Sequence, residues 1–157
     1  MKTADLIDDH ADSLALIHLP FRKFGRADFC MGQVETLSCF EDNALLKQTV
    51  GLEGQGRVLV VDGGGSTRKA IVGDMVADIA KTNGWAGLVL NGAIRDSIDI
   101  GAMDYAVFAL GTSPVKSTKS GRGTVGTDLS MGETLIRSGQ WIYADADGVL
   151  ISDIQLD

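Results

Sequence analysis

The centre of the chain contains three short apolar runs separated by glycines and by one amphipathic segment. Arg57–Asp62 stops at a triple glycine, Ala70–Val72 stops at a single glycine, and Trp85–Asn91 stops at Gly92. Continuous apolar runs of this length predict strands buried on both faces. Within Asp74–Lys81 the apolar positions 75, 76, 79 and 80 lie on one helical face. The pattern therefore predicts strand, glycine loop, short strand, helix and strand.

The segments that precede this centre follow simpler patterns. An opening helix is predicted near the N-terminus, with Thr3 or Asp5 as its cap. Leu14–Leu19 is the first apolar run, and Cys30–Cys39 alternates loosely, as a strand with one wet face would. Ala44–Val50 carries the apolar stripe of a second helix.

The segments that follow the centre include one long loop. Ser97–Met103 predicts a short helix and Tyr105–Leu110 a buried strand. Ser113–Gly126 is rich in Ser, Thr, Lys and Gly, and loops of this length are usually functional or mobile. In the last third, Thr124–Asp157, three apolar segments separated by turn residues predict a β-meander. Without any linker, residues 1–157 are predicted to form a single α/β domain with a mixed sheet.

Composition narrows the classes of protein. The chain has 157 residues, of which 45% are hydrophobic and 22% charged, as in ordinary globular domains. A net charge of −7 disfavours nonspecific binding to nucleic acid or to anionic membranes, although a local basic patch remains open. No run approaches the roughly 20 apolar residues of a membrane span. The N-terminus is too acidic for a signal peptide, so a cytoplasmic location is expected.

Two cysteines and a triple glycine have ordinary interpretations. Cys30 and Cys39 match neither a disulfide framework nor a zinc pattern, and are predicted to be buried thiols. Gly63–Gly65 resembles a phosphate cradle but lacks the Gly-Lys-Ser/Thr ending of a P-loop. We predict instead that these glycines give the backbone conformational freedom beside a site.

Two carboxylates and a guanidinium form the main candidate for chemistry. Asp74 is followed, after twenty residues, by Arg95-Asp96, and both groups stand at the ends of consecutive strand-type segments. If those ends converge, the cluster could hold a hard divalent cation beside a fixed positive charge, which suits enolate chemistry. Each part also has a plain alternative, because Asp74 could be a helix cap and Arg95-Asp96 a surface pair of little energetic value.

Several motifs together resemble the RraA-like family. That family joins the regulators of ribonuclease activity to the class II 4-hydroxy-4-methyl-2-oxoglutarate aldolases, which also decarboxylate oxaloacetate. The resemblance spans nearly the whole chain, and the Asp, twenty residues, Arg-Asp pattern is the family's catalytic signature. The matching segments are Cys39–Asn43, Val58–Ser66, Gly73-Asp74, Asn83–Gly87, Gly92–Asp96 and Tyr143–Val149.

The resemblance implies a fold, an assembly and an activity. The implied fold is an α/β sandwich with a swivelling ββα core and a mixed sheet, assembled as a homotrimer or hexamer with active sites between subunits. The implied activity is divalent-metal-dependent cleavage of 4-hydroxy-4-methyl-2-oxoglutarate to pyruvate, with oxaloacetate decarboxylation through the same pyruvate enolate. The expected substrate is thus a small 2-keto acid.

The resemblance also assigns roles to individual residues. Arg95 and Asp74 are the expected catalytic residues, and Asp96 is the expected ligand of Mg²⁺ or Mn²⁺. The substrate would contact Arg95 and the loop formed by Gly73, Asp74, Met75 and Val76. Elementary chemistry supports these assignments, because the start of a helix favours an anion and a guanidinium fork can hold an enolate oxygen.

The alternative function is that of a non-catalytic regulator that binds and inhibits a ribonuclease. In the branch of the family best known for ribonuclease inhibition, the aspartate after the arginine is replaced. This chain retains Asp96, which favours the enzyme. The longer aldolases of the family donate an acidic residue from an extended tail to the neighbouring site, and Asp153 and Asp157 are not assigned that role.

Overall fold

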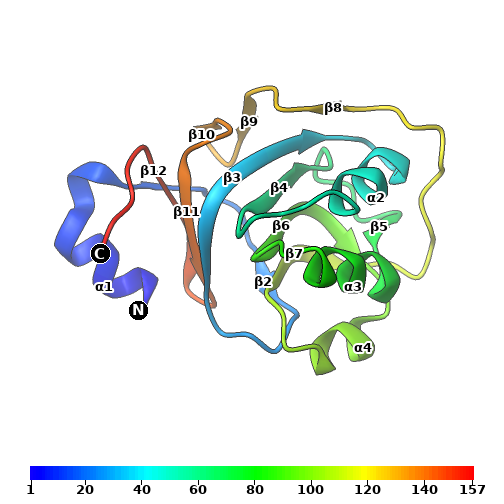
Figure 1. Cartoon of the computed structure of the whole chain (residues 1–157), viewed down its shortest axis with the longest axis horizontal. Coiled ribbons are helices and arrows are strands. Elements are labelled where there is room, and N and C mark those ends of the chain that lie inside the picture. The colour runs from blue at the N-terminus through cyan, green and yellow to red at the C-terminus, as the bar shows by residue number, and fades with distance from the viewer.

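A computed structural model describes residues 1–157 and centres on one mixed, ten-stranded sheet (Figure 1). The helices are α1 (Thr3–His10), α2 (Ala44–Val50), α3 (Asp74–Thr82) and α4 (Ser97–Ala102), with a 3-10 turn at Ala11–Ser13. The strands of the large sheet are β1 (Ala15–Leu16), β2 (Arg22–Lys23), β3 (Cys30–Ser38), β4 (Val58–Asp62), β5 (Ala70–Val72), β6 (Gly87–Ile94), β7 (Val107–Thr112), β8 (Thr124–Val125), β11 (Trp141–Asp145) and β12 (Gly148–Ser152). A separate two-stranded sheet contains β9 (Leu129–Met131) and β10 (Thr134–Ile136).

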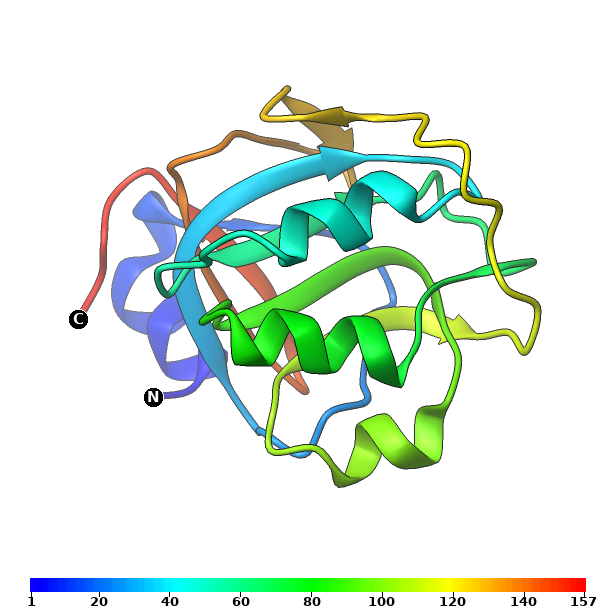
Figure 2. The same ribbon diagram turned by 45° about the vertical axis from the view of Figure 1, so that its right-hand side comes forward.

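The middle of the large sheet is parallel and its two sides are antiparallel. β3, β4, β6 and β7 run parallel in that order, and the short β5 pairs with the end of β6. On one side β11, β12 and β1 continue the sheet antiparallel, and on the other side β2 closes it. Helices α2, α3 and α4 cover one face of the parallel part (Figure 2). The mixed α/β fold predicted from the sequence is confirmed.

The parallel strands are buried on both faces, which explains their continuous apolar runs. Along β4, Leu59 and Val61 pack in the cluster that includes the helices, whereas Val58 and Val60 point to the opposite cluster beneath β11 and β12. This alternation is the period of two expected of a strand. Burial of each such side chain contributes about 1.5–3 kcal/mol to the hydrophobic stabilisation.

Helix α3 lies where the sequence predicts it, but its buried face is rotated slightly. The buried residues are Val76, Ala77 and Ala80, whereas Met75 is 68% exposed. Met75 stands in the first turn of the helix and points into solvent, so it is not part of the buried face. None of the helices in the structure is long and apolar enough to cross a membrane.

The predicted cap of the opening helix is wrong. Lys2 occupies the N-cap position and makes no side-chain cap hydrogen bond. Thr3 is buried, and its amide and hydroxyl donate to the Asp145 carboxylate in β11 over 2.8 and 2.6 Å. The Thr3 hydroxyl group, which could have capped the helix, is therefore hydrogen-bonded to a carboxylate that is distant in sequence. This contact docks α1 onto the sheet.

The predicted β-meander is only partly present. β11 and β12 form the expected antiparallel pair, but Thr134–Ile136 pairs with Leu129–Met131 in the small sheet. The apolar run at Leu14–Leu19 supplies only the two-residue edge strand β1. The long loop also ends in a strand, because β8 pairs with β3. The partners of β1 and β8 lie far away in sequence, where local periodicity carries no information.

Both cysteines are buried and free, as predicted. Burial raises the pKa of the Cys30 thiol to about 12. Burial, together with the nearby Asp42 and Asp62 carboxylates, raises the pKa of Cys39 to about 12. Both groups are therefore neutral thiols near pH 7 and have little nucleophilic character.

The Thr3–Asp145 contact generates a prediction about acid stability. Burial alone would raise the pKa of Asp145, but hydrogen bonds from Thr3 and from the Asp147 and Gly148 amides lower it below its ordinary 3.8. The contact thus stabilises the fold above about pH 4 and is lost as the pH falls below that value. We expect Asp145→Asn to lower the free energy of unfolding by about 1–2 kcal/mol at pH 7 and by less at pH 3. Urea titrations at the two pH values measure this, and an equal loss at both would contradict it.

Candidate functional site

The predicted site residues lie at the carboxyl edge of the parallel strands, where ligands collect in open α/β sheets. The parallel register of β5 and β6 places Val72 beside Ile94, and the Arg95 amide donates to the Val72 carbonyl over 2.9 Å. Gly73 and Arg95 leave the sheet side by side as a result. The convergence predicted from the spacing of Asp74 and Arg95-Asp96 is therefore found.

One small cavity gathers the predicted residues. It has a volume of about 120 Å³, well below the roughly 300–1,000 Å³ of a site for drug-sized ligands. The cavity thus suits a small molecule. All six predicted site residues line it, and so do five others: Gly73, Asp74, Met75, Val76, Arg95, Asp96, Asn43, Lys47, Ala70, Lys116 and Lys119.

Asp96 has a left-handed backbone conformation that turns its carboxylate back over the start of α3. Its φ and ψ are 56° and 43°, which lie in a region of backbone conformation that residues other than Gly, Asn and Asp rarely adopt. Oδ2 of Asp96 accepts a hydrogen bond from the Asp74 amide over 3.2 Å. A Cβ atom at Gly73 would lie 2.7 Å from that oxygen, so glycine at this position makes room for the carboxylate.

The first amides of α3 are already bound by carboxylates. Besides the Asp74 amide held by Asp96, the Met75 amide donates to Oδ1 of Asp74 over 2.8 Å. The expectation that this helix start offers its amides to an anionic substrate therefore needs correction, because a substrate carboxylate would compete with the Asp74 and Asp96 side chains for them. The alternative interpretation of Asp74 as a helix cap is partly correct, because its carboxylate accepts a hydrogen bond from the Met75 amide of the helix. The N-cap residue itself, however, is Gly73.

The Arg95–Asp96 ion pair contributes too little to stability to explain why these two side chains lie together. Arg95 Nε lies 3.9 Å from Asp96 Oδ2, and the two side chains are 43% and 35% exposed. Exposed pairs of this kind contribute about 0–1 kcal/mol. Asp99, which follows in α4, is exposed and does not line the cavity.

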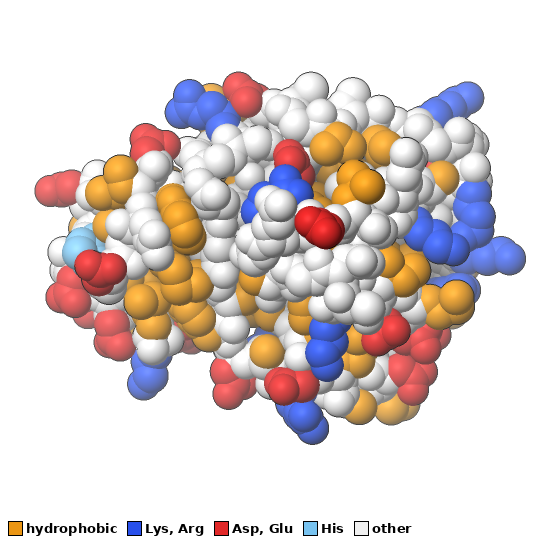
Figure 3. Space-filling view, in the orientation of Figure 1, with side chains coloured by type: hydrophobic (Ala, Val, Ile, Leu, Met, Phe, Trp, Pro, Cys, Tyr) orange, Lys and Arg blue, Asp and Glu red, His pale blue; other side chains and the backbone are white.

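Three lysines and an asparagine were not assigned to the site from the sequence. Lys47 comes from α2, and Lys116 and Lys119 come from the long loop after β7. Lys and Arg side chains gather along the right-hand edge in Figure 3, where Figure 1 places this loop. With Arg95, four cations face two carboxylates in a chain whose net charge is −7. Asn43 adds an amide oxygen that is buried without a hydrogen-bond partner.

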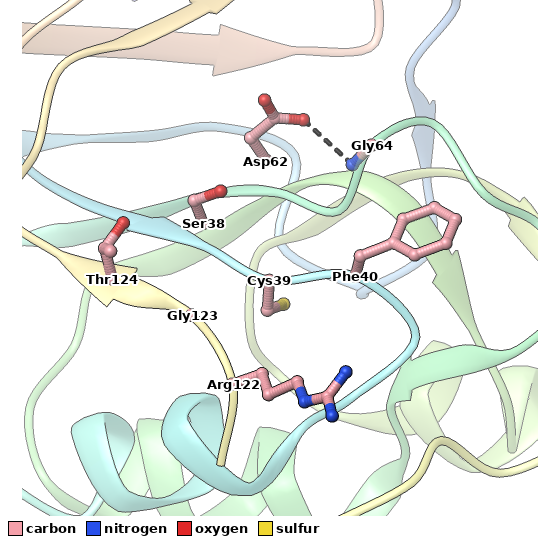
Figure 4. A pocket seen from close by; sticks show the side chains of 8 residues that line it. All are labelled: Ser38, Cys39, Phe40, Asp62, Gly64, Arg122, Gly123 and Thr124. Carbon is pink, nitrogen blue, oxygen red and sulfur yellow. Dashed lines mark hydrogen bonds between the residues drawn. The ribbon is translucent and has the colours of Figure 1, made fainter. Parts of the chain in front are cut away.

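A larger hollow of about 400 Å³ lies beyond the carboxyl ends of β3 and β4 (Figure 4). It is lined by Ser38, Cys39, Phe40, Asp62, Gly64, Arg122, Gly123 and Thr124, none of which is a predicted site residue. The middle residue of the triple glycine faces this hollow, and its amide donates to the Asp62 carboxylate over 2.9 Å. Gly64 and Gly65 have φ values of 69° and 75°, which require the backbone freedom expected there.

Comparison with known proteins agrees with this architecture. The model of the RraA-like family, described as Aldolase/RraA, matches residues 3–151. The chain belongs to the RraA-like family. A relative from Paraburkholderia phytofirmans is 45% identical, with 99% of this chain and 98% of the relative covered, and one from Arabidopsis thaliana is 43% identical, with 98% and 96% covered. Both relatives carry the provisional name 4-hydroxy-4-methyl-2-oxoglutarate aldolase.

Two similar solved structures carry other functional names. A Geobacillus kaustophilus protein described as S-adenosylmethionine:2-dimethylmenaquinone methyltransferase has a TM-score of 0.97 and 45% identity, covering 99% of this chain and 97% of its own. The RNA-processing inhibitor RraA from Thermus thermophilus has a TM-score of 0.95 and 37% identity, covering 100% and 95%. Proteins similar to this chain thus carry three different functional names.

The left-handed backbone at Asp96 generates a stability prediction. We expect Asp96→Ala to be about 1 kcal/mol less stable than Asp96→Gly, because a Cβ without a compensating polar group is strained in this conformation. The matched control is Asp99, in the first turn of α4, where alanine should be the more stable of the two by up to about 1 kcal/mol. Urea denaturation of the four variants checks both orders. The same order at both positions would contradict the prediction.

Proposed function

We propose that the chain is a divalent-metal-dependent aldolase that cleaves 4-hydroxy-4-methyl-2-oxoglutarate to pyruvate. Oxaloacetate would lose carbon dioxide to give the same pyruvate enolate, so one site would serve both reactions. The observation that carries the proposal is the meeting of Asp74, Arg95 and Asp96 in one small, cation-rich cavity. The names of the relatives support the aldolase class.

The charge of the cavity favours substrates with two carboxylates. Both proposed substrates are dicarboxylates, and the four cations that line the cavity would offset their charge. We assign the 2-oxo end to Arg95 and the distal carboxylate to the lysines. A sulfonium methyl donor carries a positive charge at its reacting atom, which the four cations of the cavity would repel, so the methyltransferase name is not extended to this chain.

Arg95 and Asp74 would perform the proton and charge chemistry. Arg95 stays protonated and donates hydrogen bonds to the oxygen on which negative charge develops. The Asp74 carboxylate accepts the proton of the 4-hydroxyl group, directly or through a water, and that loss drives cleavage of the carbon–carbon bond into pyruvate and pyruvate enolate. The same proton is then returned to the terminal carbon of the enolate, which gives the second pyruvate.

Asp96 would hold the metal ion, with water and substrate oxygens completing the shell. Its oxygen donors suit Mg²⁺ or Mn²⁺, which commonly bind proteins through one or two carboxylates. No group of three or more His, Cys, Asp or Glu side chains in the structure is placed to enclose an ion, and this mode of binding does not require one. When bound, the ion supplies Lewis-acid stabilisation of the developing enolate charge.

We also propose that the chain acts as a homotrimer or hexamer in the cytoplasm. Two large apolar side chains stand exposed on the first turns of α3 and α4, with Met75 68% and Ile98 88% exposed. Met75 lines the cavity itself. A neighbouring copy that covers these side chains would remove apolar surface from water and close the site.

The second candidate function is that of a regulator that binds a ribonuclease, and the similarity to the RNA-processing inhibitor favours it. A protein that binds a partner through its outer surface does not need an aspartate inside a cavity. The two functions therefore differ in what they require of Asp96.

Replacing Asp96 by asparagine tests the metal ligand without straining the backbone, because asparagine tolerates the left-handed region. We expect Asp96→Asn to lower Mg²⁺- or Mn²⁺-dependent pyruvate release from both substrates by about a hundredfold or more. A coupled pyruvate assay with and without chelator measures this, with Asp99→Asn as the matched control. Unchanged turnover would refute the role of Asp96. Ribonuclease inhibition by a wild-type protein that releases no pyruvate would favour the regulator.

Arg95→Lys tests the guanidinium fork. A point charge cannot reproduce two parallel hydrogen bonds, so we expect kcat to fall by roughly tenfold or more. Arg122→Lys, in the neighbouring hollow, is the matched control and should leave kcat unchanged. The same assay decides the matter, and equal kcat values for wild type and Arg95→Lys would count against the assignment.

A further inference from the structure

A buried carboxylate outside the cavity holds together the elements that supply its lysines. Asp42 is 2% exposed and forms no salt bridge. Its charge is instead compensated by four hydrogen bonds. Oδ1 accepts from the Ala44 amide over 3.2 Å and from the Gly121 amide over 3.1 Å, and Oδ2 accepts from the Thr118 hydroxyl over 3.0 Å and from the Ser120 amide over 2.6 Å.

Local helix capping does not explain this arrangement. Only the Ala44 amide belongs to the neighbouring helix α2, whereas three donors belong to a loop 76 to 79 residues further along the chain. The backbone reinforces the same contact, because the Thr118 amide donates to the Glu41 carbonyl over 2.9 Å and the Asn43 amide donates to the Thr118 carbonyl over 3.1 Å. Asp42 is thus the centre of a long-range junction.

The junction fixes the part of the loop that reaches the cavity. Lys119 lies between Thr118 and Ser120, both of which donate to Asp42. Lys116 lies just before, where the loop runs beside β5: the Ala70 amide donates to the Val115 carbonyl, and the Ser117 hydroxyl donates to the Ala70 carbonyl, each over 2.7 Å. Both lysines line the cavity. The long loop, for which function or mobility was expected, is therefore anchored along both of these stretches.

We propose that Asp42 is a positioning residue that holds Lys116 and Lys119 at the cavity and so sets the affinity of the site for dicarboxylates. This inference rests on the proposed function for the identity of the ligand. The two lysines stand near Lys47 and Arg95, and these like charges repel one another. Without the Asp42 junction, only the contacts of Val115 and Ser117 with β5 would hold this part of the loop, and Lys119 and the adjoining Lys116 could move away from this repulsion and into water.

The protonation state of Asp42 agrees with this role. Burial alone would raise the pKa of the carboxyl group, but the hydrogen bonds from the Ala44, Gly121 and Ser120 amides and from the Thr118 hydroxyl lower it to about 2. Asp42 is therefore ionised throughout the physiological range. A neutral amide in its place would turn an NH₂ group toward donors and lose two of the acceptor positions.

The test compares the Kd for succinate, a stable dicarboxylate, across a cycle of variants. Titration calorimetry measures each Kd. We expect Asp42→Asn to raise the Kd for succinate by about tenfold or more, and Lys116→Ala/Lys119→Ala to raise it by at least as much. In the triple variant Asp42→Asn should add little, because its effect acts through the lysines. Asp145→Asn, which breaks a similar carboxylate junction that docks α1 onto β11, is the matched control and should leave the Kd unchanged.

Hydrogen exchange provides the structural readout. In Asp42→Asn the amides of residues 118–121 should exchange faster, while those of α3 should not change. An unchanged Kd in Asp42→Asn, a fully additive triple variant, or a wild type that does not bind succinate would each overturn the inference. If the wild type binds succinate but releases no pyruvate from either substrate, the proposed function fails, and the binding cycle still decides the role of Asp42.

Discussion

The parallel pairing of β5 with the end of β6 is the interaction on which the site depends. β5 has only three residues, each 3% exposed or less, and its register with β6 sets Gly73 beside Arg95. Because the chain leaves both strands in the same direction, Asp74 and Asp96 are brought within one hydrogen bond of each other. A one-residue slip of β5 would turn its side chains to the other face and break the hydrogen bond between the Asp74 amide and the Asp96 carboxylate.

The residues around the cavity are individually unfavourable for stability, and the scaffold compensates for them. Asp96 has a left-handed backbone, and four cations lie near one another. The buried Asn43 oxygen has no partner. Strained and unpaired groups persist only where the surrounding structure fixes them, and they concentrate at functional sites. Here the fixed surroundings are the doubly buried parallel strands on one side and the Asp42 junction on the other.

The sequence was sufficient to predict the central elements and the residues that directly follow them. The strands around Val58–Val61 and the helix beginning at Asp74 have strong local patterns, and the site residues of this centre are adjacent to element ends. Lys116 and Lys119 could not be assigned, because their position depends on hydrogen bonds between Asp42 and a loop almost eighty residues away. Composition marked the loop as unusual but could not show where it runs.

The shared backbone cannot decide among the functional names found in this family. TM-scores of 0.95 and 0.97 connect this chain equally well to an inhibitor of RNA processing and to a protein described as a methyltransferase. What distinguishes functions on one fold is the set of side chains at the carboxyl edge of the sheet. Here one guanidinium and three lysines outnumber the two carboxylates beside α3, and they favour a small dianionic acid over a cationic donor.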